Sequence, residues 1–337
     1  MLAGEYAVLQ GSSCIACTVD RWLQVDVVAE PLGSGFTIHS DLWPEALNGD
    51  HLPPLLVQEE PLLQLIAMVR KQIPSLTDLS LQVQSQLQVS HGLGSSTAVR
   101  LAALLALQLF HQAAADHSKS ERSASGASDL LWSCAREVWQ LQLAQQGFAS
   151  GYDVVTQSAG GLIKWQASTA PWPGPIERLP PPFSARDLSS WVHVWVGGRG
   201  APTATVGGRT RRWLQAEGLN ETLIDRSDAL VQAIWSQCAA PSPDHWTQLC
   251  AAVQAHRDIF TRSPAYPTSI LEALATLPGF DQTWTFKTTG AGGEDALILF
   301  GPREALTSAF QSLEALGWQE LDALFIDTGA AWERDYP

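Results

Sequence analysis

A strand followed by a buried helix is the clearest pattern of hydrophobic and polar residues in the chain. Between residues 79 and 89, Leu and Val alternate with Ser and Gln, which is the period of a half-buried strand. Residues 99–110 are apolar almost all round, as in a helix that is buried inside a domain. The intervening residues 89–98 therefore form a turn from a strand into a helix.

The same criteria predict the other elements. Apolar residues at helical spacing predict helices at residues 55–73, 129–146, 222–235, 244–260 and 269–277. Alternation and apolar runs predict strands at residues 15–19, 23–27, 160–165 and 191–196, with two more within 284–300. Residues 4–27 as a whole are typical of a β-hairpin or meander, and residues 113–128 of a loop between helices. The proline-dense residues 171–182 predict a domain boundary near residue 185, between domains 1–185 and 186–337.

The turn at residues 89–98 has the composition of an anion site. Gly92 and Gly94 permit positive φ and a close approach of the backbone to a ligand, and Ser95 or Ser96 can cap the following helix. The unpaired N–H groups and the positive dipole end at a helix start favour a phosphate. Simple capping is the alternative. The turn is neither a Walker loop nor a dinucleotide fingerprint, because it has no Lys before the Ser and no Gly-x-Gly-x-x-Gly spacing.

Composition narrows the class of protein. The 337 residues are 45% hydrophobic and 16% charged, which is ordinary for a soluble protein with two cores. With 20 Lys plus Arg against 34 Asp plus Glu, the net charge of −14 argues against general binding to nucleic acid or anionic membranes. No apolar run is long enough to span a bilayer and no signal peptide is evident, so we expect a cytoplasmic protein. We expect it to be a monomer or a homodimer. The five scattered Cys residues predict buried thiols rather than disulfides or a metal site.

Three further stretches are candidates for chemistry. Asp153, in a turn of small residues, is a candidate base or a helix N-cap. Arg209, Arg211 and Arg212 follow a Gly/Thr loop and either recognise a phosphate or decorate a helix. The Gly- and Thr-rich residues 287–293 are either a hairpin turn or a second backbone surface for a ligand.

Taken together, four stretches resemble the GHMP small-molecule kinases, in the family's order and across nearly the whole chain. They are residues 4–9 (Gly-Glu-Tyr-Ala-Val-Leu), 91–98 (His-Gly-Leu-Gly-Ser-Ser-Thr-Ala), 150–154 (Ser-Gly-Tyr-Asp-Val) and 287–293 (Lys-Thr-Thr-Gly-Ala-Gly-Gly). The resemblance implies an α+β, two-domain GHMP kinase fold, with an N-terminal domain like domain 2 of ribosomal protein S5 and a ferredoxin-like C-terminal domain. It also implies that ATP and a small-molecule substrate meet in the cleft between the two domains.

The resemblance assigns roles to particular residues. Asp153 would be catalytic, and Ser96 would bind Mg²⁺. The residues implied for ATP binding are Gly92, Leu93, Gly94, Ser95, Ser96 and Thr97. The residues implied for substrate binding are Glu5, Tyr6, Ser150, Gly151, Thr203, Thr205, Arg209, Gly290, Ala291 and Gly292.

Within the family, the chain is most similar to the phosphomevalonate kinase and mevalonate kinase branch. Glu5-Tyr6, Asp295 and the loop from Trp195 through Thr205 resemble phosphomevalonate kinase, which implies transfer from ATP to 5-phosphomevalonate to make 5-diphosphomevalonate. Mevalonate kinase or a related kinase is one alternative. A catalytically weakened regulator that binds a nucleotide or metabolite is another.

The chain departs from the family pattern at several positions. The family's Pro-Gly-Lys would precede Met1, from which we expect that the gene product starts upstream and that the chain as given is weakly active or inactive. His91 and Glu294 replace small residues, and Gln142 replaces a Glu that binds metal in the mevalonate kinase branch. Glu137 is the nearest acid to Gln142, on a different face of the predicted helix.

Overall fold

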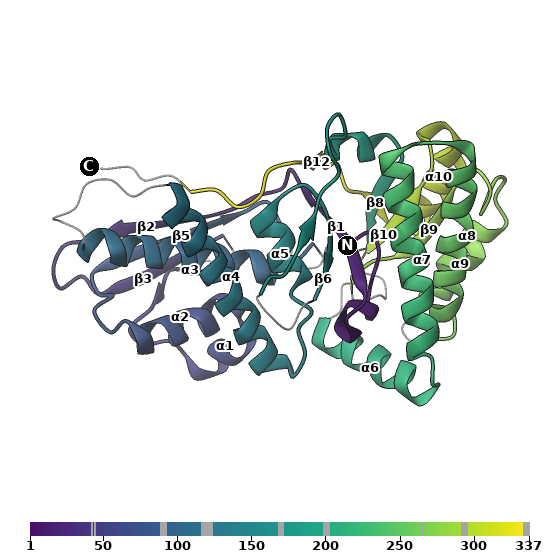
Figure 1. Cartoon of the computed structure of the whole chain (residues 1–337). Coiled ribbons are helices and arrows are strands. Elements are labelled where there is room, and N and C mark those ends of the chain that lie inside the picture. The colour runs from purple at the N-terminus through teal and green to yellow at the C-terminus, as the bar shows by residue number, and fades with distance from the viewer. Residues whose placement is uncertain are drawn as a thin grey trace. The chain divides into compact units, whose positions relative to one another are not determined.

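The chain forms two compact units of mixed helix and strand. A computed structural model describes residues 1–41, 43, 45–87, 93–115, 124–167, 172–197, 203–263, 266–290 and 296–332. Unit 1 comprises Met1–Asp20, Val89–Leu93 and Ser150–Gly329, and unit 2 comprises Arg21–Gln88, Gly94–Ala149 and Ala330–Pro337 (Figure 1). The α+β fold class is confirmed. The domain boundary near residue 185 stays a prediction.

Unit 2 contains a four-stranded sheet in the order β2-β5-β3-β4. Its strands are β2 (Leu23–Ala29), β3 (Phe36–Ser40), β4 (Leu47–Asn48) and β5 (Leu79–Ser85), with β3 parallel to β5. Its helices are α1 (Pro54–Glu59), α2 (Pro61–Gln72), α3 (Ser95–Ala115) and α4 (Ala124–Gln146). The central helix α3 packs against α2, α4 and β2 (Figure 1). This position explains why the predicted helix at 99–110 is apolar almost all round.

The predicted strand at 79–89 and the predicted helix at 55–73 are present with different ends. Strand β5 stops at Ser85, which is still paired with Leu23 of β2; its N–H donates to Asp41 and its hydroxyl to the carbonyl oxygen of Leu87. The helical region is split into α1 and α2 at Glu60, because Pro61 removes a backbone N–H and favours an extended residue before it.

The predicted hairpin or meander in residues 4–27 is wrong. Ala7–Gln10 form a 3-10 helix (η1), and β1 (Ser13–Val19) pairs with β6 (Leu162–Gln166) and β12 (Phe325–Ile326) rather than with β2. Strand β2 belongs to the sheet of unit 2 and pairs with β5. Alternation along a strand determines which side chains face a core, but it carries no information about which neighbouring strand supplies the hydrogen bonds.

Unit 1 contains two four-stranded sheets, in the orders β12-β1-β6-β7 and β11-β8-β10-β9. The remaining strands are β6 (Leu162–Gln166), β7 (Ile176–Glu177), β8 (Val192–Val196), β9 (Thr285–Thr288), β10 (Ala296–Phe300), β11 (Gln319–Glu320) and β12 (Phe325–Ile326). The helices are α5 (Tyr152–Ala159), α6 (Thr203–Ala216), α7 (Asn220–Ala239), α8 (Pro243–Phe260), α9 (Thr268–Ala275) and α10 (Thr307–Ala315), with 3-10 turns η3 (Ala185–Ser190) and η4 (Arg303–Leu306). Among the described helices, none is both long enough and apolar enough to cross a bilayer.

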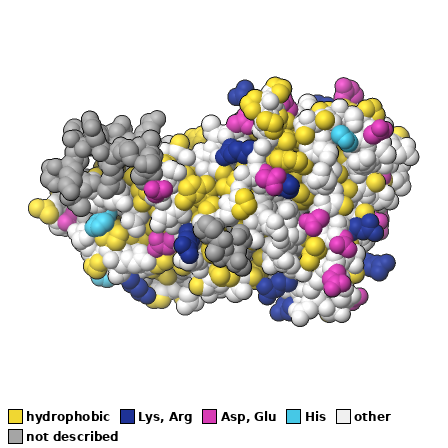
Figure 2. Space-filling view, in the orientation of Figure 1, with side chains coloured by type: hydrophobic (Ala, Val, Ile, Leu, Met, Phe, Trp, Pro, Cys, Tyr) yellow, Lys and Arg dark blue, Asp and Glu magenta, His cyan; other side chains and the backbone are white. Residues whose placement is uncertain are grey.

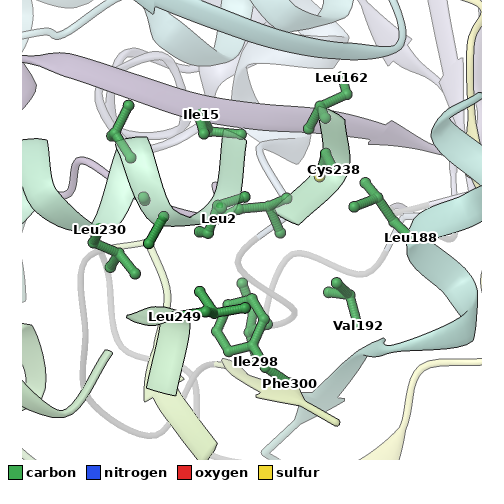
Figure 3. Packing of buried hydrophobic residues seen from close by; sticks show 14 of the residues in the cluster. Leu2, Ile15, Leu162, Leu188, Val192, Leu230, Cys238, Leu249, Ile298 and Phe300 are labelled. Atoms are coloured by element: carbon green, nitrogen blue, oxygen red, sulfur yellow. The ribbon is translucent and has the colours of Figure 1, made fainter. Parts of the chain in front are cut away.

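One hydrophobic cluster connects both sheets of unit 1 with the helix pair α7–α8. Leu2 and Ile15 contribute from the N-terminal segment and β1, Leu230 and Leu249 from α7 and α8, and Phe300 from β10 (Figure 3). All five side chains are almost completely buried. The first residues of the chain are therefore part of the interior of unit 1.

Gly160, between α5 and β6, lies against the backbone of residues 328–329. Its φ is +72°, and a Cβ built on it would be 2.2 Å from the nitrogen of Gly329. Real Cβ atoms do not approach backbone that closely, so this position accepts only glycine. Gly218, after α6, has a similar φ of +66° but nothing within 4 Å of a built Cβ.

Gly160→Ala should destabilise the protein by about 3 kcal/mol, which combines backbone strain with overpacking. Gly218→Ala is the matched control and should cost about 1 kcal/mol, because it carries only the strain of a positive φ. Urea unfolding of both variants checks the difference. Equal losses of unfolding free energy would show that the backbones of residues 160 and 329 separate easily.

Candidate functional site

The N-terminal segment leads into a tight turn at residues 4–6. Leu2 and Ala3 exchange backbone hydrogen bonds with Ile15 of β1, and Gly4 follows with φ +103°. A Cβ on Gly4 would be 2.5 Å from the Cβ of Cys14, so the turn approaches β1 too closely for any side chain. Tyr6 has φ +61°, a conformation that costs a non-glycine residue about 1–3 kcal/mol. Such strain persists only where surrounding contacts hold it.

Glu5, inside this turn, forms a buried ion pair with Lys287 of β9. The Lys287 ammonium donates to Glu5 Oε1 and to the carbonyl oxygen of Thr288, the latter over 2.7 Å. Glu5 is 4% and Lys287 1% exposed. Burial raises the pKa of Glu5, but the charge and hydrogen bond of Lys287, with His256 and the N-terminal amine, together outweigh it, and the pKa lies below its ordinary value. The carboxylate is therefore ionised at neutral pH.

His256 of α8 lies beside this ion pair. It is 2% exposed, its ring centroid is 5.1 Å from that of Phe260, and neither ring nitrogen has a hydrogen-bond partner among the described residues. Burial lowers the pKa of His256 to about 4; Glu5 opposes this shift and Lys287 reinforces it. The imidazole is therefore neutral at pH 7. The sequence analysis did not single out His256, although its place on the buried face of α8 with Val253 and Phe260 follows helical spacing.

Tyr152 and the candidate catalytic Asp153 begin α5. Gly151, in the left-handed region at φ +83°, precedes the helix, and Asp153 Oδ1 accepts the N–H of Val154 over 2.9 Å. Asp153 is thus in the first helical turn and is not the N-cap. Burial raises the pKa of Tyr152 well above its ordinary value, and the carboxylates of Asp153 and Glu5 act in the same direction. The phenol keeps its proton and lies within the field of both carboxylates.

Unit 1 therefore brings together residues from three of the four motifs. Glu5 of the first, Tyr152 and Asp153 of the third and Lys287 of the fourth interact electrostatically, although Glu5 and Lys287 are 282 residues apart. Ser150 is half-buried and Gly151 is buried next to Asp153. Gly290 directly follows Thr289, whose hydroxyl donates to the carbonyl oxygen of Met1 over 2.6 Å. Ala291 and Gly292 lie outside the described residues.

The turn that the sequence predicts as an anion site, residues 89–98, leads into α3. Gly94 has φ +77°, and its carbonyl oxygen accepts the N–H groups of Thr97 and Ala98. Leu93, Ser95 and Ser96 are half-buried. The 21 residues of α3 give its N-terminus the dipole that an anion site needs. Gly92 is outside the described residues.

Two polar residues of α4 point in different directions. The buried Gln142 donates from Nε2 to the hydroxyl of Thr97 over 2.6 Å, so an amide supports the first turn of α3. Glu137 accepts a hydrogen bond from Gln72 of α2 over 3.0 Å. The described residues contain no group of three His, Cys, Asp or Glu side chains able to hold a metal ion.

The predicted arginine cluster is on α6. Arg209, Arg211 and Arg212 are exposed, and Figure 2 shows basic side chains gathered over this helix at the lower edge of the view. Thr203 and Thr205 are in the first turn of α6, with side chains outside the description. The arginines lie in the middle and second half of the helix rather than at its start.

The cysteine thiols are free, as predicted. Four of the five are buried, and Cys17 is half-buried. Burial raises the pKa of Cys134 and Cys238 to about 12, which leaves both as unreactive thiols at neutral pH.

Comparison with known proteins supports the resemblance. Residues 61–131 match the family model described as GHMP kinases N terminal domain. No curated protein sequence matches the chain.

Solved structures of similar fold span nearly the whole chain. Phosphomevalonate kinase from Streptococcus pneumoniae, in complex with phosphomevalonate and AMPPNP, is 15% identical with a TM-score of 0.70, over 96% of this chain and 97% of that one. Mevalonate kinase from Methanococcus jannaschii is 15% identical with a TM-score of 0.66, over 96% and 95%. The Lin0012 protein from Listeria innocua is 18% identical with a TM-score of 0.67, over 96% and 94%. Residues 61–131 are therefore similar to the N-terminal domain of GHMP kinases, and the fold of the chain as a whole is that of the GHMP small-molecule kinases.

Proposed function

We propose that the protein is an ATP- and Mg²⁺-dependent small-molecule kinase whose acceptor is 5-phosphomevalonate. The observation that carries the proposal is the convergence of Glu5, Tyr152, Asp153 and Lys287 in unit 1. Ionisable groups that come together from distant parts of the chain are characteristic of a reaction site, and the pKa values of Glu5, Tyr152 and Lys287 are shifted. The whole-chain fold similarity to a phosphomevalonate kinase determined with its acceptor and an ATP analogue is consistent with this choice.

The residues at the start of α3 fit the triphosphate of a nucleoside triphosphate such as ATP. The N–H groups of residues 93–96 and the positive end of a long helix suit an anion, and Gly94 has no side chain to obstruct it. Mg²⁺ binds few protein oxygens and takes the rest from phosphate and water, so the Ser96 hydroxyl suffices as a protein ligand. When bound, ATP and Mg²⁺ supply the transferable phosphoryl group and offset its charge.

Asp153 is the proposed catalytic residue. Its Oδ1 is fixed by the N–H of Val154, while the side chain is only half-buried, so a ligand can reach the carboxylate. It accepts the proton of the acceptor oxygen or orients that oxygen for attack on the γ-phosphorus. Tyr152 stays protonated and adds no second negative charge.

A phosphorylated acceptor gives the arginines of α6 a purpose in a protein whose net charge is −14. Arginine forms bidentate hydrogen bonds to phosphate, and three of them within four residues concentrate positive charge on one helix. The acceptor contacts proposed with them are Glu5, Tyr6, Ser150, Gly151, Thr203, Thr205, Arg209, Gly290, Ala291 and Gly292. We further propose that the protein acts in the cytoplasm as a monomer or a homodimer.

Replacing Arg209, Arg211 and Arg212 singly with Met should raise the acceptor KM for at least one of the three. The expected loss is about 1.5–3 kcal/mol, the range of a hydrogen bond to a charged group, with the ATP KM unchanged. Steady-state kinetics with phosphomevalonate measures it. If none of the three substitutions changed the acceptor KM, the arginines would be surface residues of α6 without a role in acceptor binding.

The acceptor is identified by a coupled assay of ADP release with mevalonate, phosphomevalonate, homoserine and galactose. Turnover with phosphomevalonate above the other three supports the proposal, and preference for mevalonate selects the nearest alternative. The second candidate function is a regulator that binds a nucleotide without efficient transfer. The uncharged Gln142, engaged with Thr97, favours it because it removes one carboxylate ligand for Mg²⁺. ATP binding by calorimetry without turnover on any acceptor would select the regulator.

A further inference from the structure

Residues 1–6 are joined to the end of β9 and the residue after it by two hydrogen bonds, one of which reaches the turn at residues 4–6. Lys287 donates to Glu5 within the turn, and the hydroxyl of Thr289 donates to the carbonyl oxygen of Met1. Glu5 and Tyr6 on one side and Gly290 on the other are proposed acceptor contacts. The two hydrogen bonds therefore join the two backbone segments that we assign to the acceptor.

The Glu5–Lys287 pair is an inefficient way to stabilise a fold. Glu5 Oε2 is buried without a hydrogen-bond partner among the described residues, and so are both ring nitrogens of the neighbouring His256. A buried ion pair repays its desolvation only when its remaining atoms are satisfied, and apolar residues of similar volume often stabilise equally well. The unsatisfied atoms call for an explanation other than stability.

The strained backbone beside the ion pair provides an explanation for these unsatisfied atoms. Gly4 and Tyr6 both have positive φ, and the Tyr6 ring packs against Phe260 at a centroid distance of 5.8 Å. A strained non-glycine residue needs contacts that overdetermine its conformation, and strain of this kind clusters at ligand sites. The ion pair with Lys287 holds Glu5, and the contact with Phe260 holds Tyr6, so both side chains of the turn are fixed.

We propose that Lys287 is a positioning residue: through its buried pair with Glu5, it holds the strained turn at residues 4–6 in the shape that receives the acceptor. The inference rests on the proposed kinase function for its kinetic consequence. Its structural consequence, that the pair holds the turn, is independent of any substrate.

The test is the double variant Glu5→Leu/Lys287→Met, which replaces the ion pair by apolar side chains of similar volume. It avoids the unpaired buried charge that Lys287→Met alone would leave and that could prevent folding. We expect its melting temperature to stay within a few degrees of the original. We expect the acceptor KM to rise by about 10-fold or more while the ATP KM changes less than about twofold, because the acceptor side of the site loses the Glu5 carboxylate together with the shape of the turn.

Hydrogen–deuterium exchange measures the turn directly. The N–H groups of Ala7, Val8 and Leu9 donate to backbone oxygens of residues 4–6, so they report on the turn. In the double variant these amides should exchange about 10-fold faster, with the rest of the chain unchanged. The control variant, Arg303→Met/Glu320→Leu, removes an exposed bidentate ion pair of unit 1 and should alter neither these amides nor the acceptor KM.

The outcomes separate the two levels of the inference. Faster exchange together with a raised acceptor KM supports it. Unchanged exchange overturns the claim that the pair holds the turn, and faster exchange with an unchanged acceptor KM overturns the claim that the turn positions the acceptor. If the unmodified protein turns over no acceptor, the proposed function fails; the exchange comparison, which needs no substrate, still supports or overturns the role of the pair.

Discussion

Asp153→Asn should lower kcat by about 100-fold or more while leaving the affinity for ATP unchanged. The amide has the size of the carboxylate and can still accept the N–H of Val154, so the first turn of α5 is retained. It cannot take a proton from the acceptor oxygen. Single-turnover kinetics separates this chemical defect from a defect in substrate binding.

The matched control is Asp244→Asn, in the first turn of α8. Both substitutions remove a negative charge from a helix N-terminus, an effect of about 0.3–1 kcal/mol on stability. Asp244→Asn should therefore reproduce any small change in melting temperature and leave turnover intact. Full turnover in Asp153→Asn would remove Asp153 from the mechanism.

Gly94→Val should abolish nucleotide binding. Gly94 has φ +77°, which a β-branched residue resists strongly, and the side chain would stand where the backbone must approach the phosphates. Calorimetric titration with the non-hydrolysable analogue AMPPNP measures the loss without interference from turnover.

Gly147→Val is the control for backbone strain in the same unit. Gly147 ends α4 with φ +71°, and a built Cβ meets nothing within 4 Å. It should lose a similar amount of stability and still bind the nucleotide. A folded Gly94→Val protein with ordinary affinity would contradict the assignment of the phosphate turn.

Helices were predictable because their signal is local. The predicted helix at 244–260 is α8, Pro243–Phe260, and its bounds follow from a Ser N-cap, a Pro in the first turn and apolar residues at helical spacing. The predicted helix at 222–235 is α7, which is longer at both ends. Tertiary contacts extend a helix beyond the residues that carry the periodic pattern.

Strand pairing was not predictable because it depends on distant residues. Residues 15–19 and 23–27 are close in sequence and both are predicted strands, yet the first pairs with β6 and β12 and the second with β5. The choice depends on which strand edges the rest of the fold leaves open. One sequence carries no record of that.

The site shows the same limit at the level of side chains. Asp153 and the turn at Gly94 are proposed from local motifs, each within a few residues. The Glu5–Lys287 pair joins residues 282 apart, and Lys287 received no role although its motif was recognised. His256 belongs to no motif, and only its place on the buried face of α8 could have drawn attention to it.

The pairing of β1 with β12 has a consequence for how the protein is made. The Thr18 hydroxyl donates to the carbonyl oxygen of Ile326, 308 residues later. At a synthesis rate of about 5–20 residues per second, β1 leaves the ribosome roughly 15–60 s before its partner exists. The sheet of unit 2 is complete once β5 has emerged, so unit 2 can fold while unit 1 waits with an open strand edge. During that interval the open edge of β1 is a site at which the nascent chain can pair with another chain.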